Sequence, residues 1–245
     1  MVARGSVRPA GCLWPALIGG RLVKRYKRFL ADVVLDSGTV VTAHCPNSGR
    51  MTGCSLPGQP VYLSHQDSPK RKLKYRWELI EMPTSLVGVN TLVPNRLVAD
   101  ALRAGAIPPL KGYGDVSAEV AVNARSRLDL KLTGRGLPDC YVEIKNCTLV
   151  EGGVAMFPDA PTTRGKKHLR ELSLLKGRGM RAVIFFLIQR MDARTFAPAD
   201  RIDPEYGRQL RKAVDHGVEI MVYDAHIDLK GIRLRNDLPW RLQRI

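Results

Sequence analysis

Two short runs, Ser126-Arg-Leu-Asp129-Leu and Pro138-Asp-Cys-Tyr-Val-Glu143-Ile-Lys145, decide the fold of this 245-residue chain. Both are rich in β-forming residues, and a glycine-containing turn separates them, which predicts neighbouring strands. Residues two apart on a strand point to the same face, so Glu143 and Lys145 share one face. Pairing of the two strands would bring the carboxylate of Asp129 close to Glu143.

Asp129, Glu143 and Lys145 are the candidate catalytic residues. Two converging carboxylates can hold a hard cation such as Mg²⁺, and a lysine beside them can orient a water or offset charge on a phosphate. The alternative is a solvated charge ladder across an exposed face. Tyr141 and Ile144 favour the first interpretation because they predict a largely buried strand, where charged residues need a partner or a metal.

Composition indicates a soluble globular protein with a polyanionic partner. The net charge is +16 and the isoelectric point is near 10, and no basic amphipathic helix stands out, so nucleic acid is favoured over a membrane. No stretch is long enough to span a bilayer. Five cysteines without a C-x-x-C pair indicate neither a disulfide framework nor a zinc site, and reduced thiols predict a cytoplasmic protein.

Residues 1–16 are expected to be a disordered extension, and residues 17–84 to form a small Greek-key barrel of the oligonucleotide-binding (OB) kind. Four or five short strands with turn signals lie in this second region. Residues 1–84 carry a net charge of +8, half of the total on about a third of the chain. The basic residues interleaved with aromatics are candidate phosphate contacts: Lys24, Arg25, Lys27, Arg28, Lys70, Arg71, Lys72 and Lys74. Alternatively, they are solvated outer faces of strands whose aromatics fill the barrel.

Residues 85–245 predict a second domain with a mixed sheet covered by helices. A capped helix after Pro94 is followed by a three-strand meander, a helix at 163–176, an apolar strand at 181–188, a further helix and a last strand. The predicted fold class is therefore α+β with two domains, an all-β barrel followed by an α/β mixed-sheet domain.

Several motifs in this order resemble the sugar fermentation stimulation protein A family. They cover residues 20 to about 225 and include the runs Arg25-Tyr-Lys-Arg-Phe-Leu-Ala-Asp-Val, His44-Cys-Pro-Asn-Ser-Gly-Arg-Met51, Tyr141-Val-Glu-Ile-Lys-Asn-Cys-Thr-Leu149 and Arg164-Gly-Lys-Lys-His-Leu-Arg-Glu171. The resemblance implies an OB-like barrel joined to a PD-(D/E)xK nuclease-like domain. It also implies DNA binding with little sequence preference and a link to the regulation of sugar (maltose) metabolism. Asp129, Glu143 and Lys145 then match the nuclease triad, with Glu119 as a weaker fourth acid.

Two functions remain open from the sequence. In the first, Asp129, Glu143 and the Ile144 carbonyl hold Mg²⁺ or Mn²⁺ for a nuclease. In the second, the protein is a non-catalytic DNA-binding regulatory factor with a vestigial nuclease fold. Further expected nucleic-acid contacts, to single- or double-stranded DNA, are Asn47, Arg50, Arg164, Lys166, Lys167 and His168. For the last four, a basic helix tip without a ligand, with His168 paired to Glu171 on the surface, is the alternative.

Overall fold

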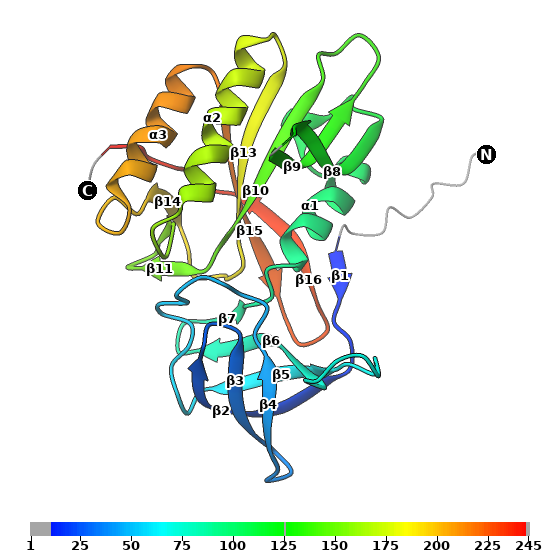
Figure 1. Cartoon of the computed structure of the whole chain (residues 1–245), viewed down its shortest axis with the longest axis vertical. Helices are drawn as coiled ribbons and strands as arrows, with labels where there is room; N and C mark the ends of the chain where they lie inside the picture. Colours follow the sequence, from blue (N-terminus) through cyan, green and yellow to red (C-terminus); the bar gives the residue numbers. More distant parts are fainter. Residues whose placement is uncertain (1–10, 125, 244–245) are drawn as a thin grey trace, which may run out of the picture.

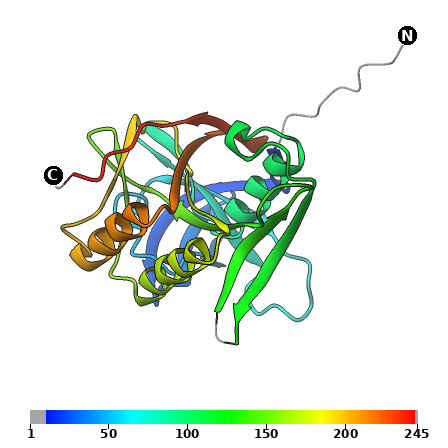
Figure 2. The same ribbon diagram turned by 90° about the horizontal axis from the view of Figure 1, so that it is seen from above.

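The computed structural model describes residues 11–124 and 126–243, which form a small barrel and a larger sheet domain stacked along the long axis of the molecule (Figure 1). The predicted fold class is confirmed. Helices cover both faces of the larger sheet, as the view from above shows (Figure 2).

Six strands make the barrel: β2 (Leu17–Tyr26), β3 (Leu30–Leu35), β4 (Val40–His44), β5 (Pro60–His65), β6 (Tyr75–Met82) and β7 (Ser85–Gly88). They are ordered β4-β3-β2-β5-β6-β7, and a parallel pairing of β4 with β6 closes five of them. Leu22, Leu63 and Trp77 are fully buried and fill the interior, since they lie on the inward faces of their strands. Because β7 pairs with β6, the barrel extends to Gly88, and the boundary predicted after residue 84 is too early.

Seven strands make the larger sheet: β1 (Gly11–Leu13), β8 (Asp115–Asn123), β9 (Ser126–Thr133), β10 (Cys140–Cys147), β13 (Arg181–Ile188), β15 (Glu219–Ile227) and β16 (Gly231–Asp237). Their order is β1-β16-β15-β13-β10-β9-β8, with β13 parallel to both β10 and β15. The central strand β13 is apolar from Ala182 to Ile188, as expected for a strand with both faces covered. A smaller sheet contains β11 (Leu149–Glu151), β12 (Val154–Phe157) and β14 (Thr195–Pro198).

Two apolar layers lie on opposite faces of the larger sheet. On one face, α1 (Val93–Arg103) and the short 3₁₀ helix η1 (Pro108–Leu110) pack against β10, β13 and β15. On the other face, α2 (Thr163–Gly177) and α3 (Pro204–Asp215) pack against the opposite side chains of β10 and β13. Strand β10 is therefore held between helices from two different parts of the chain.

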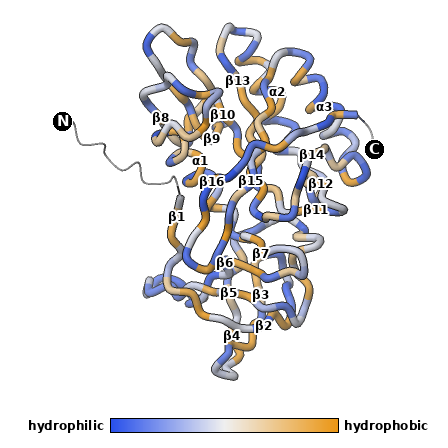
Figure 3. The backbone as a smooth tube through the Cα atoms, turned by 180° about the vertical axis from the view of Figure 1, so that it is seen from behind, coloured by the Kyte–Doolittle hydropathy of each residue, from blue (hydrophilic) through white to orange (hydrophobic). Residues whose placement is uncertain are grey.

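Residues 11–16 include the strand β1 and contacts to the larger sheet, so the prediction of a disordered extension is wrong for these residues. β1 pairs with β16 at the edge of the larger sheet and buries Cys12, and the two strands lie side by side when the molecule is seen from behind (Figure 3). The indole N–H of Trp14 donates to the Asp228 carbonyl at 2.8 Å. Apolar contacts and ladder bonds with a strand more than 200 residues away order this segment, and its local composition gives no sign of them. Residues 1–10 lie outside the described residues.

Candidate active site

The candidate site lies where β9 separates from β10. The ladder between these strands ends with the pair Val142 and Leu130, although β9 continues its pairing with β8 to Ser126. Just beyond this point, the Ile144 N–H donates to Oδ2 of Asp129 at 2.7 Å. The carboxylate of Asp129 thus replaces a strand partner for β10 and is held next to Glu143.

Asp129 is also held by the helix on one face of the sheet. The Asn95 side-chain amide, in the first turn of α1, donates to Oδ1 of Asp129 at 2.8 Å. Burial raises the pKa of Asp129 to about 6, and the nearby negative charge of Glu143 adds to this effect. The bonds from Ile144 and Asn95 stabilise the ionised form and oppose the increase.

Glu143 is held by side chains on the opposite face. Its carboxylate is buried, and Oε1 accepts a hydrogen bond from Nζ of Lys145 at 2.5 Å and another from Nδ1 of His168 on α2. Burial alone would raise the pKa of Glu143, but the His168 hydrogen bond and the Lys145 charge outweigh it and lower that pKa. Nε2 of His168 accepts from Nε of Arg164 at 3.4 Å, which fits a neutral imidazole with its proton on Nδ1.

The second oxygen of Glu143 is left without a partner. Oε2 is buried and makes no hydrogen bond within the described part of the chain, although Oε1 carries two. A buried carboxylate oxygen without a donor is unfavourable unless water or a cation meets it. Asp129, Glu143 and the Ile144 carbonyl form an oxygen donor set of the kind that hard divalent cations prefer.

Glu119 does not join this pair. It lies on the outer strand β8, its side chain is exposed, and its φ of +52° marks a local distortion of the strand. Among residues 11–124 and 126–243, no three His, Cys, Asp or Glu side chains form a group that could hold a metal ion. The structure therefore does not bring the predicted fourth acid to the site.

The predicted contacts of the barrel divide into two groups. Lys24, Lys27, Arg28, Arg50 and the loop cations Lys70, Arg71, Lys72 and Lys74 are exposed. Arg25 and Asn47 instead have structural partners. The Arg25 guanidinium donates to the carbonyls of Arg28, Asn47, Gly49 and Arg50 at 2.7–3.2 Å, and the buried Asn47 amide donates to the Val89 carbonyl. These two side chains hold the loop at 47–50 in place.

The basic cluster at the start of α2 is also divided. Arg164 is exposed, whereas Lys166 pairs with the buried Asp203 at 3.3 Å and Lys167 is half-buried. His168 is only 4% exposed and bonds to Glu143, so the alternative of a surface pair with Glu171 is wrong. His168 therefore belongs to the carboxylate site. The sequence does not reveal its contact with Glu143, because the two residues are 25 positions apart and lie on different elements.

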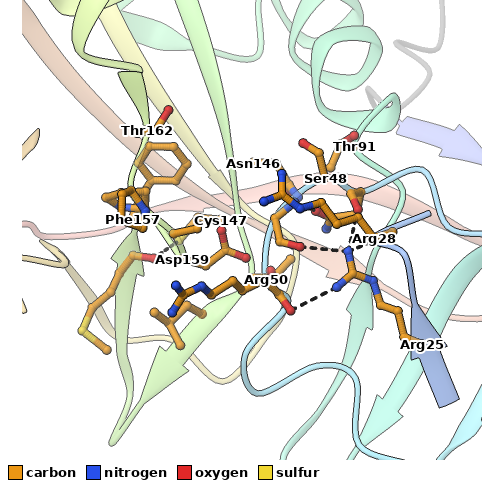
Figure 4. Close-up of a pocket in the computed structure, with 18 residues that line it drawn as sticks. Arg25, Arg28, Ser48, Arg50, Thr91, Asn146, Cys147, Phe157, Asp159 and Thr162 are labelled. Carbon is orange, nitrogen blue, oxygen red and sulfur yellow. Dashed lines mark hydrogen bonds between the residues drawn. The ribbon is translucent and has the colours of Figure 1, made fainter. Parts of the chain in front are cut away.

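A pocket of about 590 Å³ lies beside the site, at the junction of the barrel and the larger domain. The loop at 47–50 and the 157–162 segment before α2 form opposite walls, and Asn146 to Leu149 of β10 and β11 form its floor (Figure 4). Met51 donates its backbone N–H to Oδ2 of Asp159 at 2.9 Å, which ties the barrel loop to the larger domain. Asn146, the residue that follows Lys145 on β10, is part of the pocket lining.

Sequence reasoning missed Asn95, Gln189 and Asp159. Gln189 follows the apolar strand β13, and its amide donates to Asn146 at 2.8 Å and to the Asn90 carbonyl at 3.2 Å. It therefore connects the interdomain linker with the strand that carries Glu143. A polar residue directly after a fully apolar central strand was the available signal, because the ends of such strands gather functional side chains.

The chain therefore belongs to a class of two-domain proteins. The first domain is a closed five-strand barrel of the OB kind, and the second is a mixed-sheet domain with a nuclease-like fold and a site of two carboxylates and a lysine. Comparison with family models agrees. Residues 23–89 match the "SfsA N-terminal OB domain", and residues 92–231 match the "Sugar fermentation stimulation protein RE domain". The chain belongs to the sugar fermentation stimulation protein family.

Curated relatives and a solved structure support this assignment. The sugar fermentation stimulation protein homolog of Geotalea uraniireducens (strain Rf4) is 53% identical over 226 residues, which cover 92% of this chain and 97% of the relative. The homolog of Shewanella sp. (strain ANA-3) is 46% identical over 230 residues, covering 93% and 98%. The solved structure of Pyrococcus furiosus SfsA in complex with Ca²⁺ is 27% identical, with a TM-score of 0.86 and coverage of 94% of this chain and 98% of that chain.

No helix among the described residues is both long and apolar enough to cross a membrane. All five cysteines are free and buried. Burial raises the pKa of the Cys54, Cys140 and Cys147 thiols to about 12, so these thiols stay protonated and unreactive at neutral pH.

Proposed function

We propose that this protein binds DNA with little sequence preference and cleaves it at a divalent-metal site formed by Asp129, Glu143 and the Ile144 carbonyl. The observation that carries the proposal is the buried Oε2 of Glu143, which has no partner among the described residues. The Ca²⁺ complex of the Pyrococcus furiosus protein supports a divalent cation in this family. Mg²⁺ and Mn²⁺ are the cations proposed for cleavage, because phosphoryl substrates can complete their oxygen coordination.

Each side chain of the site has a role in this proposal. When bound, a divalent cation supplies Lewis-acid activation of a phosphodiester and of a water molecule. Asn95 and the Ile144 N–H fix the direction of the Asp129 carboxylate. His168 fixes Glu143, and Lys145 lies at the same oxygen with 11% of its side chain exposed, so its amine can reach a phosphate or an attacking water.

In this proposal, the exposed cationic side chains on the barrel and at the start of α2 bind the DNA. Their charge acts on backbone phosphates, so affinity should fall steeply with salt and vary little with sequence. The family name refers to the stimulation of sugar fermentation, and we propose that such binding serves the regulation of sugar metabolism. A non-catalytic DNA-binding factor is the second candidate, favoured by the absence of a three-carboxylate group in the described residues.

The test is cleavage of labelled single- and double-stranded DNA with Mg²⁺, Mn²⁺, Ca²⁺ or chelator. Asp129→Ala and Lys145→Ala should abolish divalent-dependent cleavage and leave DNA affinity nearly unchanged. Asp115→Ala, which removes an exposed carboxylate from the neighbouring strand β8, is the matched control and should retain activity. If the wild type cleaves nothing with any of these metals, the non-catalytic candidate is the better account.

A further inference from the structure

The pocket at the domain junction has a cationic end formed by the barrel. Arg28 and Arg50 line it, both are exposed, and neither guanidinium is paired with a carboxylate within the described part of the chain. Arg25 lies behind them and shapes this wall through its four bonds to backbone carbonyls. Figure 4 shows Arg25 bonded to the loop at 47–50 and the side chain of Arg50 extending toward Asp159. Two unpaired guanidinium groups at the mouth of a pocket suit a phosphate.

The opposite end of the pocket is apolar and belongs to the larger domain. Met156, Phe157 and Pro158 line it. Asp159 stands between the two ends, and its carboxylate is oriented by the Met51 N–H. A fixed carboxylate beside apolar side chains can accept a hydrogen bond from the exocyclic amine of a base while the base lies against the apolar wall.

We propose that this pocket binds one unpaired nucleotide of a nucleic-acid strand, with its phosphate on Arg28 and Arg50 and its base toward Phe157 and Asp159. The volume of about 590 Å³ lies within the range of sites that enclose one small ligand. A base inside a duplex can enter such a pocket only after it is unstacked and unpaired, which opposes binding. The pocket therefore selects strand ends, overhangs and single strands over an uninterrupted duplex.

Strand β10 connects this pocket to the carboxylate site. Asn146, on the pocket wall, directly follows Lys145 and lies three residues, about 10 Å along the strand, from Glu143. A strand whose unpaired nucleotide fills the pocket thus passes the proposed metal site. The pocket proposal rests on the DNA-binding part of the proposed function, and only this last step rests on cleavage, because binding in the pocket does not require cleavage.

The test measures binding of the full-length protein in chelator, so that no strand is cut. The probes are a blunt hairpin duplex, the same hairpin with a five-nucleotide overhang, and a single nucleoside monophosphate. Arg50→Ala and Arg28→Asn remove the cationic end, and asparagine suits the positive φ of 63° at position 28. Ser48→Trp fills the pocket without removing a charge, since Ser48 is exposed on its wall. Arg178→Ala, at the far end of α2, is the charge-matched control.

We expect the overhang probe to bind more tightly than the blunt hairpin to the wild type and to Arg178→Ala. Each arginine variant should weaken overhang binding by about tenfold or more, the loss expected for a charge-assisted hydrogen bond. Ser48→Trp should remove the preference for the overhang but keep the affinity for the blunt duplex. Equal weakening of both hairpins would overturn the proposal, as would an overhang preference that survives Ser48→Trp. A monophosphate that binds as tightly as the overhang would also overturn it, because the pocket would then be a site for free nucleotides.

These outcomes are separate from those of the nuclease test. An overhang preference that depends on Arg50 can stand even if no metal supports cleavage. Conversely, cleavage of blunt duplex by both the wild type and Ser48→Trp would support the proposed nuclease and contradict the pocket as its route for substrate.

Discussion

Replacing Glu143 by glutamine should destabilise the larger domain by about 3 kcal/mol in chelator, because it removes the negative partner of a buried cation. Oε1 of Glu143 accepts from Nζ of Lys145 at 2.5 Å, and the two side chains are 3% and 11% exposed. Breaking a buried ion pair costs about 3–5 kcal/mol, and the lower end applies because the lysine amine keeps some contact with solvent. For a chain of this length, such a loss lowers Tm by roughly 6–12 °C.

The same substitution should abolish stabilisation by metal. A cation present at 100 times its Kd adds about 2.7 kcal/mol to the stability of a protein that binds it only when folded. The wild type should therefore gain roughly 5–11 °C in Tm when Mg²⁺ or Mn²⁺ replaces chelator. The glutamine variant should gain nothing, because the unpaired Oε2 oxygen is no longer part of a carboxylate.

Calorimetric melts of both proteins, with chelator and with each metal, measure the two effects together. Glu171→Gln on α2 is the control, because it removes a glutamate that is not part of the site. A Glu143→Gln protein that melts with the wild type in chelator would refute the buried ion pair. A variant that is still stabilised by metal as much as the wild type would refute the assignment of Glu143 as a ligand.

Three further substitutions test the site and its supports. Burial raises the folded pKa of Asp129 to about 6 from 3.8, so the folded state holds this proton more tightly and the free energy of unfolding falls as pH rises from about 4 to 6. Asp129→Asn lacks this loss and should be more stable than the wild type in chelator at pH 7.5, by about 3 kcal/mol, but not at pH 4. Urea titrations at both pH values check this prediction. Arg25→Ala should destabilise the barrel by about 2–3 kcal/mol by removing four hydrogen bonds to carbonyls, whereas Lys24→Ala should leave the thermal melt unchanged. Gly88→Ala would place a Cβ 2.5 Å from Oε1 of Gln189, so it should lower the free energy of unfolding by about 1–3 kcal/mol and reduce cleavage. Unchanged stability and cleavage would mean that the domain junction adapts freely to the added methyl group.

Much of the larger domain could be predicted because its strands and helices carry strong local patterns. The apolar run Arg181–Ile188 is the observed central strand, and the α2 helix begins at the predicted Thr163. Asp203 begins α3 as an N-cap, since its side chain accepts from the Tyr206 N–H. In each case neighbouring residues supply the signal, and no distant contact competes with it.

The parts that could not be predicted depend on contacts between distant segments. The sequence indicates that Asp129, Glu143 and Lys145 converge, but it does not indicate that His168 bonds to Glu143 or that Asn95 bonds to Asp129. These contacts require the packing of α1 and α2 on opposite faces of one sheet, which no local pattern specifies. The structural role of Arg25 was hidden for a similar reason, because an arginine among other cations on a strand resembles a phosphate contact until the carbonyls around it are known.

The carboxylates lie where the pairing of β9 with β10 stops, close to the end of β10 that reaches the interdomain pocket. From Ser126 to Asp129, before Leu130, β9 pairs with β8 but not with β10, so the Asp129 side chain satisfies a peptide N–H that the ladder would otherwise bond. The end of β10 then runs from Lys145 to Asn146 at the pocket, where Asn146 accepts a hydrogen bond from Gln189. A separate contact, from the Met51 N–H to Asp159, joins the segment at 157–162 to the barrel loop. One strand therefore carries the proposed chemistry and part of the pocket floor, and it contacts the interdomain linker through Gln189. If this strand transmits position between the domains, a weakened junction should disturb the carboxylate site without any change to the carboxylates themselves.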